Sequence, residues 1–406
     1  MFSGSIYFIN KGTIDINEHQ YSENRSVNLP ISIGIVKETS DNENRVALVP
    51  DDAKKLVAKK MEVLVQSGAG SSAGFLDAEY VSAGCKVLGE SKEVISMANL
   101  IIMLGRPDAQ DLSKFKPKST VVGQIYPLRF QTLVRDLARA DLTVYSLELL
   151  PRTTRAQSMD VLSSQSAVAG YRAAIIGAYN SPRLMPMLTT AAGTVKPANV
   201  LVIGAGVAGL MAIATAKRLG ALVTAYDVRK AAGNDVRSLG AKFLEVGFNA
   251  EGAGGYAREL TEEEKNKEKE MLETAIISSD LLITTAGVPG KKAPMIVSAE
   301  TISKMKAGSV IVDTMAESGG NCELTQRGKI IDHNGVKIIG SINPQSEVPI
   351  NSSQMYSRNV SSFLSILVGQ DGNFVEPEKD ELLAACMICN GGKVTFPPLV
   401  NEGEGK

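Results

Sequence analysis

The chain has 406 residues, which is too long for one ordinary hydrophobic core and makes two domains the default expectation. Hydrophobic residues make up 44% and charged residues 21%, as in soluble globular proteins, and the net charge of −1 gives no electrostatic basis for binding nucleic acid or an anionic membrane. The four scattered cysteines fit a reducing compartment better than a disulfide framework.

The first thirty residues differ from the rest of the chain. They are rich in Asn, Ser and Glu and show no helical periodicity. A mitochondrial presequence would be rich in Arg and poor in acids, whereas this stretch has one Arg and several acids. We expect residues 1–30 to be a flexible tail or linker.

Residues 31–163, completed by 352–406, are expected to form a first α/β domain. Strands are predicted at 31–36, 61–66, 99–104, 119–125 and 142–149, and helices at 51–60, 91–97 and 130–139. No glycine fingerprint follows the first strand, where KETSDNENRVAL occupies the turn. The Gly-rich stretch 67–75 has no phosphate-binding Lys at Walker spacing, so we interpret it as a connecting turn.

A polar cluster at residues 151–171 follows the predicted strand 142–149. It therefore lies at a carboxyl end, where open α/β sheets bind ligands. Its side chains with binding chemistry are Arg152, Arg155, Gln157, Asp160, Ser163 and Gln165. The alternative is a solvated loop in which Ser163 or Ser164 is the N-cap of a helix at 165–179.

The second domain, expected at 164–351, contains a long uncharged run, VLVIGAGVAGLMAIATA at 200–216. Its 17 residues are fewer than the roughly 20 that a membrane-spanning helix needs. Gly204, Gly206 and Gly209 within it spell G-x-G-x-x-G, preceded by the strand-like NVLVI and followed by a helical stretch and a second strand that ends at Asp227. This order of strand, glycine turn, helix, strand and acid is the dinucleotide-binding fingerprint.

Each residue of the fingerprint has a physical task. Gly204 permits the tight turn, Gly206 lets a pyrophosphate approach the backbone, and Gly209 lets helix and strand pack closely. The helix N-terminus offers unpaired N–H groups to the phosphates. Asp227 can accept hydrogen bonds from the ribose hydroxyls and repels a 2′-phosphate, so NAD(H) is predicted over NADP(H), although the nearby Arg229 keeps the choice of cofactor open.

The alternation of strands and helices continues beyond Asp227. Strands are predicted at 241–246, 280–287, 309–314 and 335–342, and helices at 262–279 and in ETISKMK. The loop 247–262 holds four glycines and one tyrosine, and a loop of this length is usually functional or disordered. A helix at 352–368 leads back to the first domain. The predicted fold class is α/β, with two doubly wound Rossmann-like domains and a cleft between them.

The sequence lacks an obvious acid–base residue. A dehydrogenase that reduces a carbonyl moves a proton with the hydride, and His is the commonest donor. The two histidines are His19, in the tail, and His333, in the turn-like DHNG. Lys or Asp could replace His, but the pattern favours a reaction whose acceptor needs no proton, such as hydride transfer between two nicotinamide rings.

Cys386 and Cys389 form a C-x-x-C pair near the C-terminus. No second cysteine pair or nearby His completes a zinc site, so we predict no metal and interpret the pair as packing residues.

Several segments together resemble one family. RAQSMDVLSSQS, AGYRAA, GAGVAGL, AYDVR, GAGGYARE, KAGSVIVDTMAESGGNCE and the opening IGIVKETSDNENRVALVP are similar to domain I, the NAD(H)-binding component of proton-translocating nicotinamide nucleotide transhydrogenase. The resemblance spans about residues 31–400. The related alanine dehydrogenases share the two-domain fold, but their catalytic His motif is not evident here.

The resemblance implies partners. Domain I binds NAD(H), is usually a homodimer, and docks on a separate domain that holds NADP(H), while a transmembrane proton-channel domain couples hydride transfer to proton translocation. This chain shows neither the membrane helices nor the second nucleotide domain. We therefore expect a subunit or an excised piece, soluble and peripheral to a membrane on its cytoplasmic or matrix side through its partners.

The resemblance also implies roles for residues. Arg152 and Asp160 would hold the nicotinamide end, Ser163 would bind its carboxamide, and Gln157 would reach toward the partner's nucleotide. Tyr256 matches the tyrosine of a mobile loop that closes over NAD(H). Gly287 stands where the family commonly has a larger apolar residue, which leaves the contacts there open. The full set of expected cofactor contacts is Gly204, Ala205, Gly206, Val207, Gly209, Asp227, Val228, Arg229, Tyr256, Thr285, Ala286 and Gly287.

The sequence leaves two alternative functions. One is a free alanine-type dehydrogenase that uses NAD. The other is a non-catalytic NAD sensor, which would bind NADH without exchanging hydride with any partner.

Overall fold

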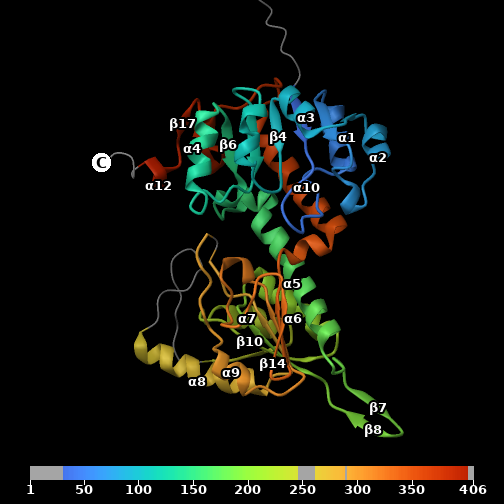
Figure 1. The fold of residues 1–406 in the computed structure, drawn as a ribbon, viewed down its shortest axis with the longest axis vertical. Helices are drawn as coiled ribbons and strands as arrows, with labels where there is room; N and C mark the ends of the chain where they lie inside the picture. The colour runs from blue at the N-terminus through green and yellow to red at the C-terminus, as the bar shows by residue number, and fades with distance from the viewer. Residues whose placement is uncertain (1–30, 246–260, 289, 401–406) are drawn as a thin grey trace, which may run out of the picture.

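The computed structural model describes residues 31–245, 261–288 and 290–400. The chain forms two lobes stacked along its long axis, each built on its own β-sheet (Figure 1). Residues 31–149 and the C-terminal segment lie in one lobe, and the sheet that begins at Asn199 lies in the other. The predicted fold class, α/β with two Rossmann-like domains, is confirmed.

The sheet of the first lobe has eight strands in the order β17-β16-β6-β5-β4-β1-β2-β3. The strands are β1 (Ser32–Ile35), β2 (Glu62–Gln66), β3 (Lys86–Leu88), β4 (Leu100–Ile102), β5 (Thr120–Gly123), β6 (Thr143–Ser146), β16 (Met387–Asn390) and β17 (Lys393–Val394). β1 to β6 pair in parallel, whereas β16 runs antiparallel to β6. Because the six strands are parallel, the loops that follow them leave from one edge of the sheet.

Helices cover both faces of this sheet. They are α1 (Pro50–Ala58), α2 (Asp77–Ser82), α3 (Ser91–Met97), α4 (Gln131–Arg139), α10 (Pro349–Leu367), α11 (Glu381–Cys386) and α12 (Pro397–Val400). α1 begins with Pro50, a residue suited to the first helical turn, where no N–H partner is available. α10 buries Tyr356 and Phe363 in the core, and the Phe363 ring meets Tyr145 of β6 edge-on at 5.6 Å. The chain thus returns to its first lobe through α10, as predicted.

The sheet of the second lobe has seven strands in the order β11-β10-β9-β12-β13-β15-β14. The strands are β9 (Asn199–Ile203), β10 (Leu222–Tyr226), β11 (Lys242–Phe243), β12 (Leu281–Thr284), β13 (Val310–Asp313), β14 (Ile330–His333) and β15 (Val336–Gly340). All pairs are parallel except β14 with β15. The helices of this lobe are α6 (Val207–Arg218), α7 (Ala232–Ser238), α8 (Glu262–Ser278) and α9 (Ala299–Ser303).

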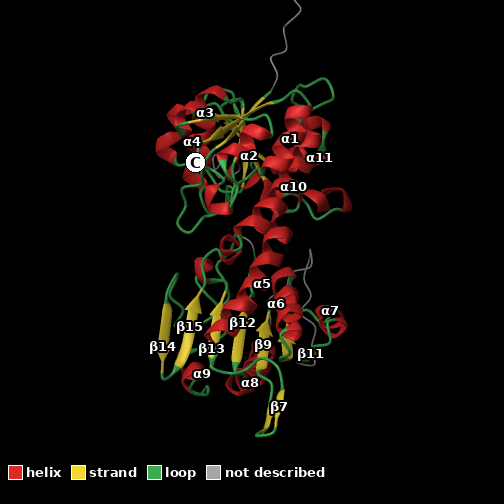
Figure 2. Cartoon of the chain, turned by 90° about the vertical axis from the view of Figure 1, so that its right-hand side faces the viewer, coloured by secondary structure: helices red, strands yellow, loops and turns green. Residues whose placement is uncertain are grey.

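One long helix, α5 (Val161–Asn180), joins the lobes and packs along α6 (Figure 2). Two glycines allow the close approach of its neighbours. A Cβ atom on Gly170 would lie 1.9 Å from the carbonyl oxygen of Ala208, and one on Gly177 would lie 2.6 Å from the Leu281 side chain. Within the described residues, no helix combines the length and the apolar character that a bilayer span requires.

The structure differs from the sequence prediction in several places. α5 begins at Val161, and its N-cap is Asp160 rather than Ser163 or Ser164, because the Asp160 carboxylate accepts the exposed N–H of the first turn. The predicted strand 142–149 ends at Ser146 and continues as a 3₁₀ turn, and the strand predicted at 241–246 is confined to β11. The sequence analysis missed β3, β14, β16, β17 and a two-stranded hairpin, β7 (Leu188–Thr190) and β8 (Gly193–Val195). Residues 1–30 and 246–260 lie outside the described residues.

Candidate functional site

The glycine turn after β9 has the geometry expected of a phosphate-binding turn. Gly204 adopts a φ of 94°, which favours glycine, and Gly206 is the N-cap of α6, which begins at Val207. A Cβ atom on Gly206 would meet no atom within 4 Å, whereas one on Gly209 would lie 1.8 Å from the Gly204 carbonyl oxygen. The backbone at Gly206 is therefore open to a ligand, and the helix N-terminus beside it suits an anion. These residues fit a dinucleotide pyrophosphate.

The segment after β12 borders this turn. Thr285 donates its backbone N–H to the Ile203 carbonyl at 2.8 Å and its hydroxyl to the Gly204 carbonyl at 3.0 Å. These bonds tie the ends of β9 and β12 together at the point where the strand order reverses, which is the usual ligand crevice of a doubly wound sheet. Ala286 and Gly287 follow directly. A Cβ atom on Gly287 would lie 2.5 Å from the Met315 sulfur, so the Met315 side chain fills the space beside this glycine.

Asp227 lies beside the glycine turn, as the fingerprint predicts. Its Oδ2 accepts the backbone N–H of Ala205 at 2.8 Å, so the end of β10 is bonded to the turn after β9. The same carboxylate is paired with Arg229, whose Nε donates to Oδ1 at 2.9 Å and whose terminal nitrogen donates to Oδ2 at 2.8 Å. Val228 stands between the two residues. The spacing of the fingerprint predicted the position of Asp227 but not its pairing with Arg229.

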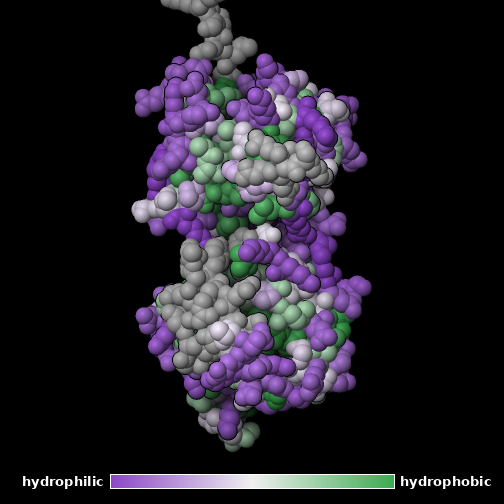
Figure 3. Space-filling view, turned by 90° about the vertical axis from the view of Figure 1, so that its left-hand side faces the viewer, coloured by the Kyte–Doolittle hydropathy of each residue, from purple (hydrophilic) through white to green (hydrophobic). Residues whose placement is uncertain are grey.

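The loop between β6 and α5 carries the second group of predicted site residues. It lies where the two lobes meet and where the surface narrows (Figures 1 and 3). Asp160 accepts two hydrogen bonds from Ser163, one from the backbone N–H at 2.9 Å and one from the hydroxyl. Arg152 and Gln157 are exposed on the same loop. A carboxylate and a hydroxyl are thus joined at the N-terminus of α5, which stabilises negative charge.

Two other residues of the polar cluster have structural contacts instead. Arg155 forms an ion pair with Asp380, the N-cap of α11, and so ties the loop to the C-terminal segment. Gln165 is buried, accepts a hydrogen bond from Arg45 at 2.7 Å and donates one to the Ser352 carbonyl. The side chains of Arg155 and Gln165 are therefore engaged in contacts within the protein.

A buried ion pair between Glu43 and Arg45 lies where the lobes join, and sequence reasoning missed it. Both side chains are only 6% exposed, and the Arg45 Nε donates to Glu43 at 2.7 Å. Burial alone would raise the pKa of Glu43, but hydrogen bonds and charge from Arg45 outweigh it and hold the pKa below its ordinary value. Asn343 donates to Glu43, and Ser346 accepts from the Asn44 backbone. No local pattern signals contacts across about 300 residues of chain.

Two further buried acids follow strands of the first sheet. Glu38 accepts the Leu104 N–H at 2.6 Å and also bonds Gly105, and burial raises its pKa to about 7. Burial also raises the pKa of Glu148, which accepts hydrogen bonds from the Ser146 hydroxyl and the Tyr126 backbone. Glu38 can therefore retain a proton near neutral pH. The sequence analysis assigned no role to either acid, although Glu38 lies in the segment IGIVKETSDNENRVALVP that carries the family resemblance.

His333 does not lie at the ligand-binding edge. It is the last residue of β14 and pairs with Val336 at the start of β15, which places it at the amino edge of the sheet. Its Nε2 lies 2.8 Å from the Ser303 hydroxyl. His19 falls outside the described residues. Over the described ranges, therefore, no imidazole is available as a proton donor at the glycine turn.

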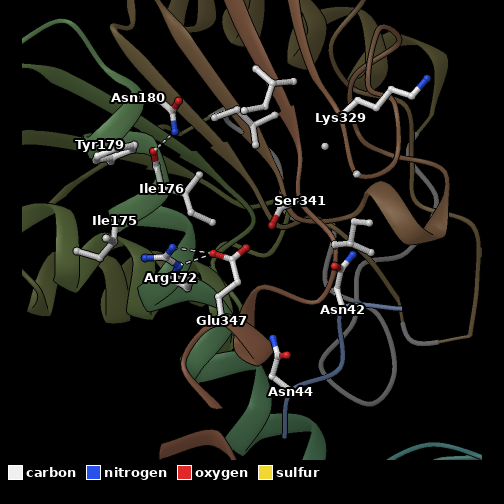
Figure 4. A pocket seen from close by; sticks show the side chains of 15 residues that line it. Asn42, Asn44, Arg172, Ile175, Ile176, Tyr179, Asn180, Lys329, Ser341 and Glu347 are labelled. Atoms are coloured by element: carbon white, nitrogen blue, oxygen red, sulfur yellow. Dashed lines mark hydrogen bonds and ion pairs between the residues drawn. The ribbon is translucent and has the colours of Figure 1, made fainter. Parts of the chain in front are cut away.

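A cavity of about 710 Å³ lies between α5 and the β14–β15 edge of the second lobe (Figure 4). Arg172 of α5 lines it and pairs with Glu347 at 2.7 Å. Its lining mixes amides, one lysine and branched apolar side chains: Asn42, Asn44, Ile175, Ile176, Tyr179, Asn180, Lys329, Ile330, Ile339, Ser341 and Ile342. None of the residues predicted to bind a cofactor belongs to this lining.

The cysteine pair is packed in the interior. Cys386 and Cys389 are both buried, and their thiols donate to the carbonyls of Leu382 and Leu142. Burial raises the pKa of both thiols, that of Cys389 to about 12, so neither is a thiolate at neutral pH. In the described part of the chain no three His, Cys, Asp or Glu residues are grouped so that they could hold a metal ion.

Comparison with known proteins gives concordant matches. Residues 34–169 match the family model of the alanine dehydrogenase/PNT N-terminal domain, and residues 173–397 match that of the C-terminal domain. The chain is 42% identical over 383 residues to the first part of NAD(P) transhydrogenase subunit alpha of Rhodospirillum rubrum, covering 92% of this chain and 100% of the relative. The crystal structure of transhydrogenase from Sinorhizobium meliloti superposes with a TM-score of 0.81 at 40% identity, covering 89% of this chain and 99% of that one. Alanine dehydrogenase of Mycobacterium tuberculosis is 31% identical over 304 residues, covering 74% of this chain and 76% of the relative.

Proposed function

The chain belongs to the alanine dehydrogenase/PNT family, and from that premise we propose that it is the NAD(H)-binding component of a proton-translocating nicotinamide nucleotide transhydrogenase. In this role it holds NAD(H) while a partner domain holds NADP(H), and hydride passes between the two. The observation that carries the proposal is the glycine turn at Gly204–Gly209, open at Gly206, in a chain whose described residues place no imidazole beside it.

Direct transfer between two nicotinamide rings needs positioning rather than acid–base catalysis. When bound, the nicotinamide supplies the hydride donor or acceptor. The Ser163 hydroxyl donates to Asp160, so its oxygen remains an acceptor for the carboxamide N–H. Arg152 and Asp160 hold the nicotinamide end, and the exposed Gln157 extends toward the partner's nucleotide. The task of these residues is to align the two rings and exclude water.

The second lobe selects and holds the rest of the cofactor. Gly204, Ala205, Gly206 and Val207 surround the pyrophosphate, while Thr285, Ala286 and Gly287 border the nicotinamide side. Asp227 binds the adenosine ribose and disfavours a 2′-phosphate, which supports NAD(H) over NADP(H). Tyr256 closes over the bound cofactor in this proposal, although it lies outside the described residues.

The proposal includes partners. The hairpin β7–β8 extends from the end of the second lobe (Figure 1). Leu188 and Val195 on the hairpin are 46% and 50% exposed, and Met187 directly before it is 64% exposed. Apolar side chains on a projecting arm are suited to burial against another protein surface, and a second copy of this chain provides one in a symmetric dimer. An NADP(H)-binding domain and a membrane domain that translocates protons complete the assembly and hold the chain peripheral to the membrane, on its cytoplasmic or matrix side.

We also propose that the chain divides into a first domain, residues 31–163 with 352–406, and an NAD(H)-binding domain, residues 164–351. The division is supported by the two separate sheets, since β16 and β17 join the strands of the first lobe and β9 to β15 form the other sheet.

One alternative function has a specific observation in its favour, the 31% identity to an alanine dehydrogenase. A free dehydrogenase of this type would produce NADH from NAD and alanine without any partner. Against it, the described residues offer no histidine at the glycine turn to move the accompanying proton.

A mixing assay distinguishes these functions. The chain is combined with an isolated NADP(H)-binding transhydrogenase domain, NADPH and an oxidised NAD analogue whose reduced form absorbs at a distinct wavelength. We expect reduction of the analogue only when both proteins are present. NADH production from alanine by this chain alone would establish the alternative, and NADH binding without exchange with any partner would indicate a sensor.

A further inference from the structure

The carboxylate of Asp227 has no acceptor capacity left. Oδ1 accepts the backbone N–H and the Nε of Arg229, both at 2.9 Å. Oδ2 accepts the Ala205 N–H and the terminal nitrogen of Arg229, both at 2.8 Å. A carboxylate offers about four lone-pair sites, and four donors occupy them here. A ribose hydroxyl can therefore reach Asp227 only by displacing one of these donors.

The guanidinium of Arg229 is the group that can leave. The Ala205 and Arg229 backbone N–H groups are held by the chain itself, whereas the side chain of Arg229 is 24% exposed and can rotate away. The guanidinium directs two donors at the two carboxylate oxygens, and the two adjacent hydroxyls of a ribose present donors in the same way. The side chain of Arg229 thus occupies the position that a ribose diol needs.

We propose that Arg229 is a specificity-determining residue. Its guanidinium competes with the adenosine ribose for Asp227, and its pairing with Asp227 keeps it from binding a 2′-phosphate. The ribose of NAD(H) displaces the guanidinium and replaces its two hydrogen bonds. A 2′-phosphorylated ribose has lost one donor and carries negative charge, so it cannot replace them, and the guanidinium stays on Asp227. Selectivity for NAD(H) resides in the pair rather than in Asp227 alone. This inference rests on the proposed function.

The test measures dissociation constants of the full chain for NADH and NADPH by the fluorescence of the reduced nicotinamide. The variants are Arg229→Ala, Asp227→Ser, and the two combined. Arg218→Ala is the matched control, since Arg218 is an exposed arginine at the far end of α6. Thermal unfolding of each variant establishes that it is folded.

We expect Arg229→Ala to bind NADH more tightly, by roughly three- to tenfold, because a partly exposed ion pair no longer has to open. Asp227→Ser should bind NADPH at least fivefold more tightly, which corresponds to about 1 kcal/mol. The reason is that Arg229, no longer paired with Asp227, becomes a phosphate ligand. The double variant should lose this gain. Arg218→Ala should leave both constants within twofold of the wild type.

Two results would overturn the inference. Weaker NADH binding by Arg229→Ala would make Arg229 an ordinary adenosine ligand, and an equal NADPH gain in the double variant would exclude Arg229 as the phosphate ligand. If Asp227→Ser does not fold, the test uses Arg229→Lys instead, because a lysine cannot bond both carboxylate oxygens of Asp227. NADH binding by Arg229→Lys that is tighter than in the wild type supports competition, and weaker binding contradicts it. A wild-type chain that binds no NADH overturns the proposed function itself, which separates the two failures.

Discussion

The Asp160 carboxylate accepts both the backbone N–H and the hydroxyl of Ser163, so the same acid caps α5 and fixes the direction of the Ser163 hydroxyl. In the proposed function, this one side chain both caps the helix and binds the nicotinamide end of the cofactor. A substitution that tests Asp160 must therefore remove its charge and still accept the hydrogen bond of the helix N-cap.

Asp160→Asn combined with Arg152→Ala should lower the rate of hydride exchange in the mixing assay by at least tenfold, or about 1.4 kcal/mol in barrier. Asn is as good an N-cap as Asp, so α5 should remain intact. The control is Arg155→Ala, which removes the same charge from the same loop but from a residue paired with Asp380. Exchange at the full rate in the double variant would contradict the proposed site.

Glu43→Gln should destabilise the protein by about 3–5 kcal/mol, because it leaves the charge of Arg45 buried without its carboxylate. The measurement is the midpoint of urea unfolding. Glu376→Gln, which removes an acid from the exposed pair with Lys379, should change the midpoint little. Glu43→Gln combined with Arg45→Met should recover part of the loss. A small effect of Glu43→Gln alone would show that Arg45 gains water or another partner.

The pH dependence of stability should carry the signature of Glu38. Burial raises its pKa from 4.5 to about 7, so the folded protein binds this proton more tightly than the unfolded chain does. The contribution of this proton to the free energy of unfolding is fully present below pH 4.5 and is lost as the pH rises through 7. Glu38→Gln cannot ionise, so its stability relative to the wild type should increase by about 2–3 kcal/mol between pH 5 and pH 8. Parallel profiles for the two proteins would disprove a raised pKa.

The same added methyl group should have opposite consequences at two glycines of one turn. Gly206→Ala should leave the thermal midpoint unchanged, since nothing lies within 4 Å of the new Cβ, yet weaken NADH binding at least tenfold by blocking the pyrophosphate. Gly209→Ala should cost about 1–3 kcal/mol of stability, because its Cβ would lie 1.8 Å from the Gly204 carbonyl oxygen. Calorimetry and NADH titration of both variants check the contrast, which fails if the two behave alike.

Much of the architecture could be predicted because it depends on short-range patterns. The glycine turn, α6 and Asp227 lie within about 30 residues of one another, and the run of branched residues in β9 identifies a buried strand. β14 and β16 were missed for different reasons. β14 is a short edge strand that pairs only with β15, the strand directly after it, whereas β16 returns from the end of the chain to pair with β6. The helix start was misplaced because Asp160, Ser163 and Ser164 are all good caps by type, and only the geometry distinguishes them.

By itself, the sequence determined the strand–turn–helix units, the open backbone at Gly206 and the acid at the end of β10, since spacing along the chain specifies which of these groups meet. The tertiary structure alone decided which charges are buried and what they contact. Arg45 meets Gln165 and Asn343, 120 and 298 residues away, and Glu38 acquires its high pKa from burial. Burial and long-range pairing arise only when the sheets and α5 pack together, so no local pattern of residues encodes them.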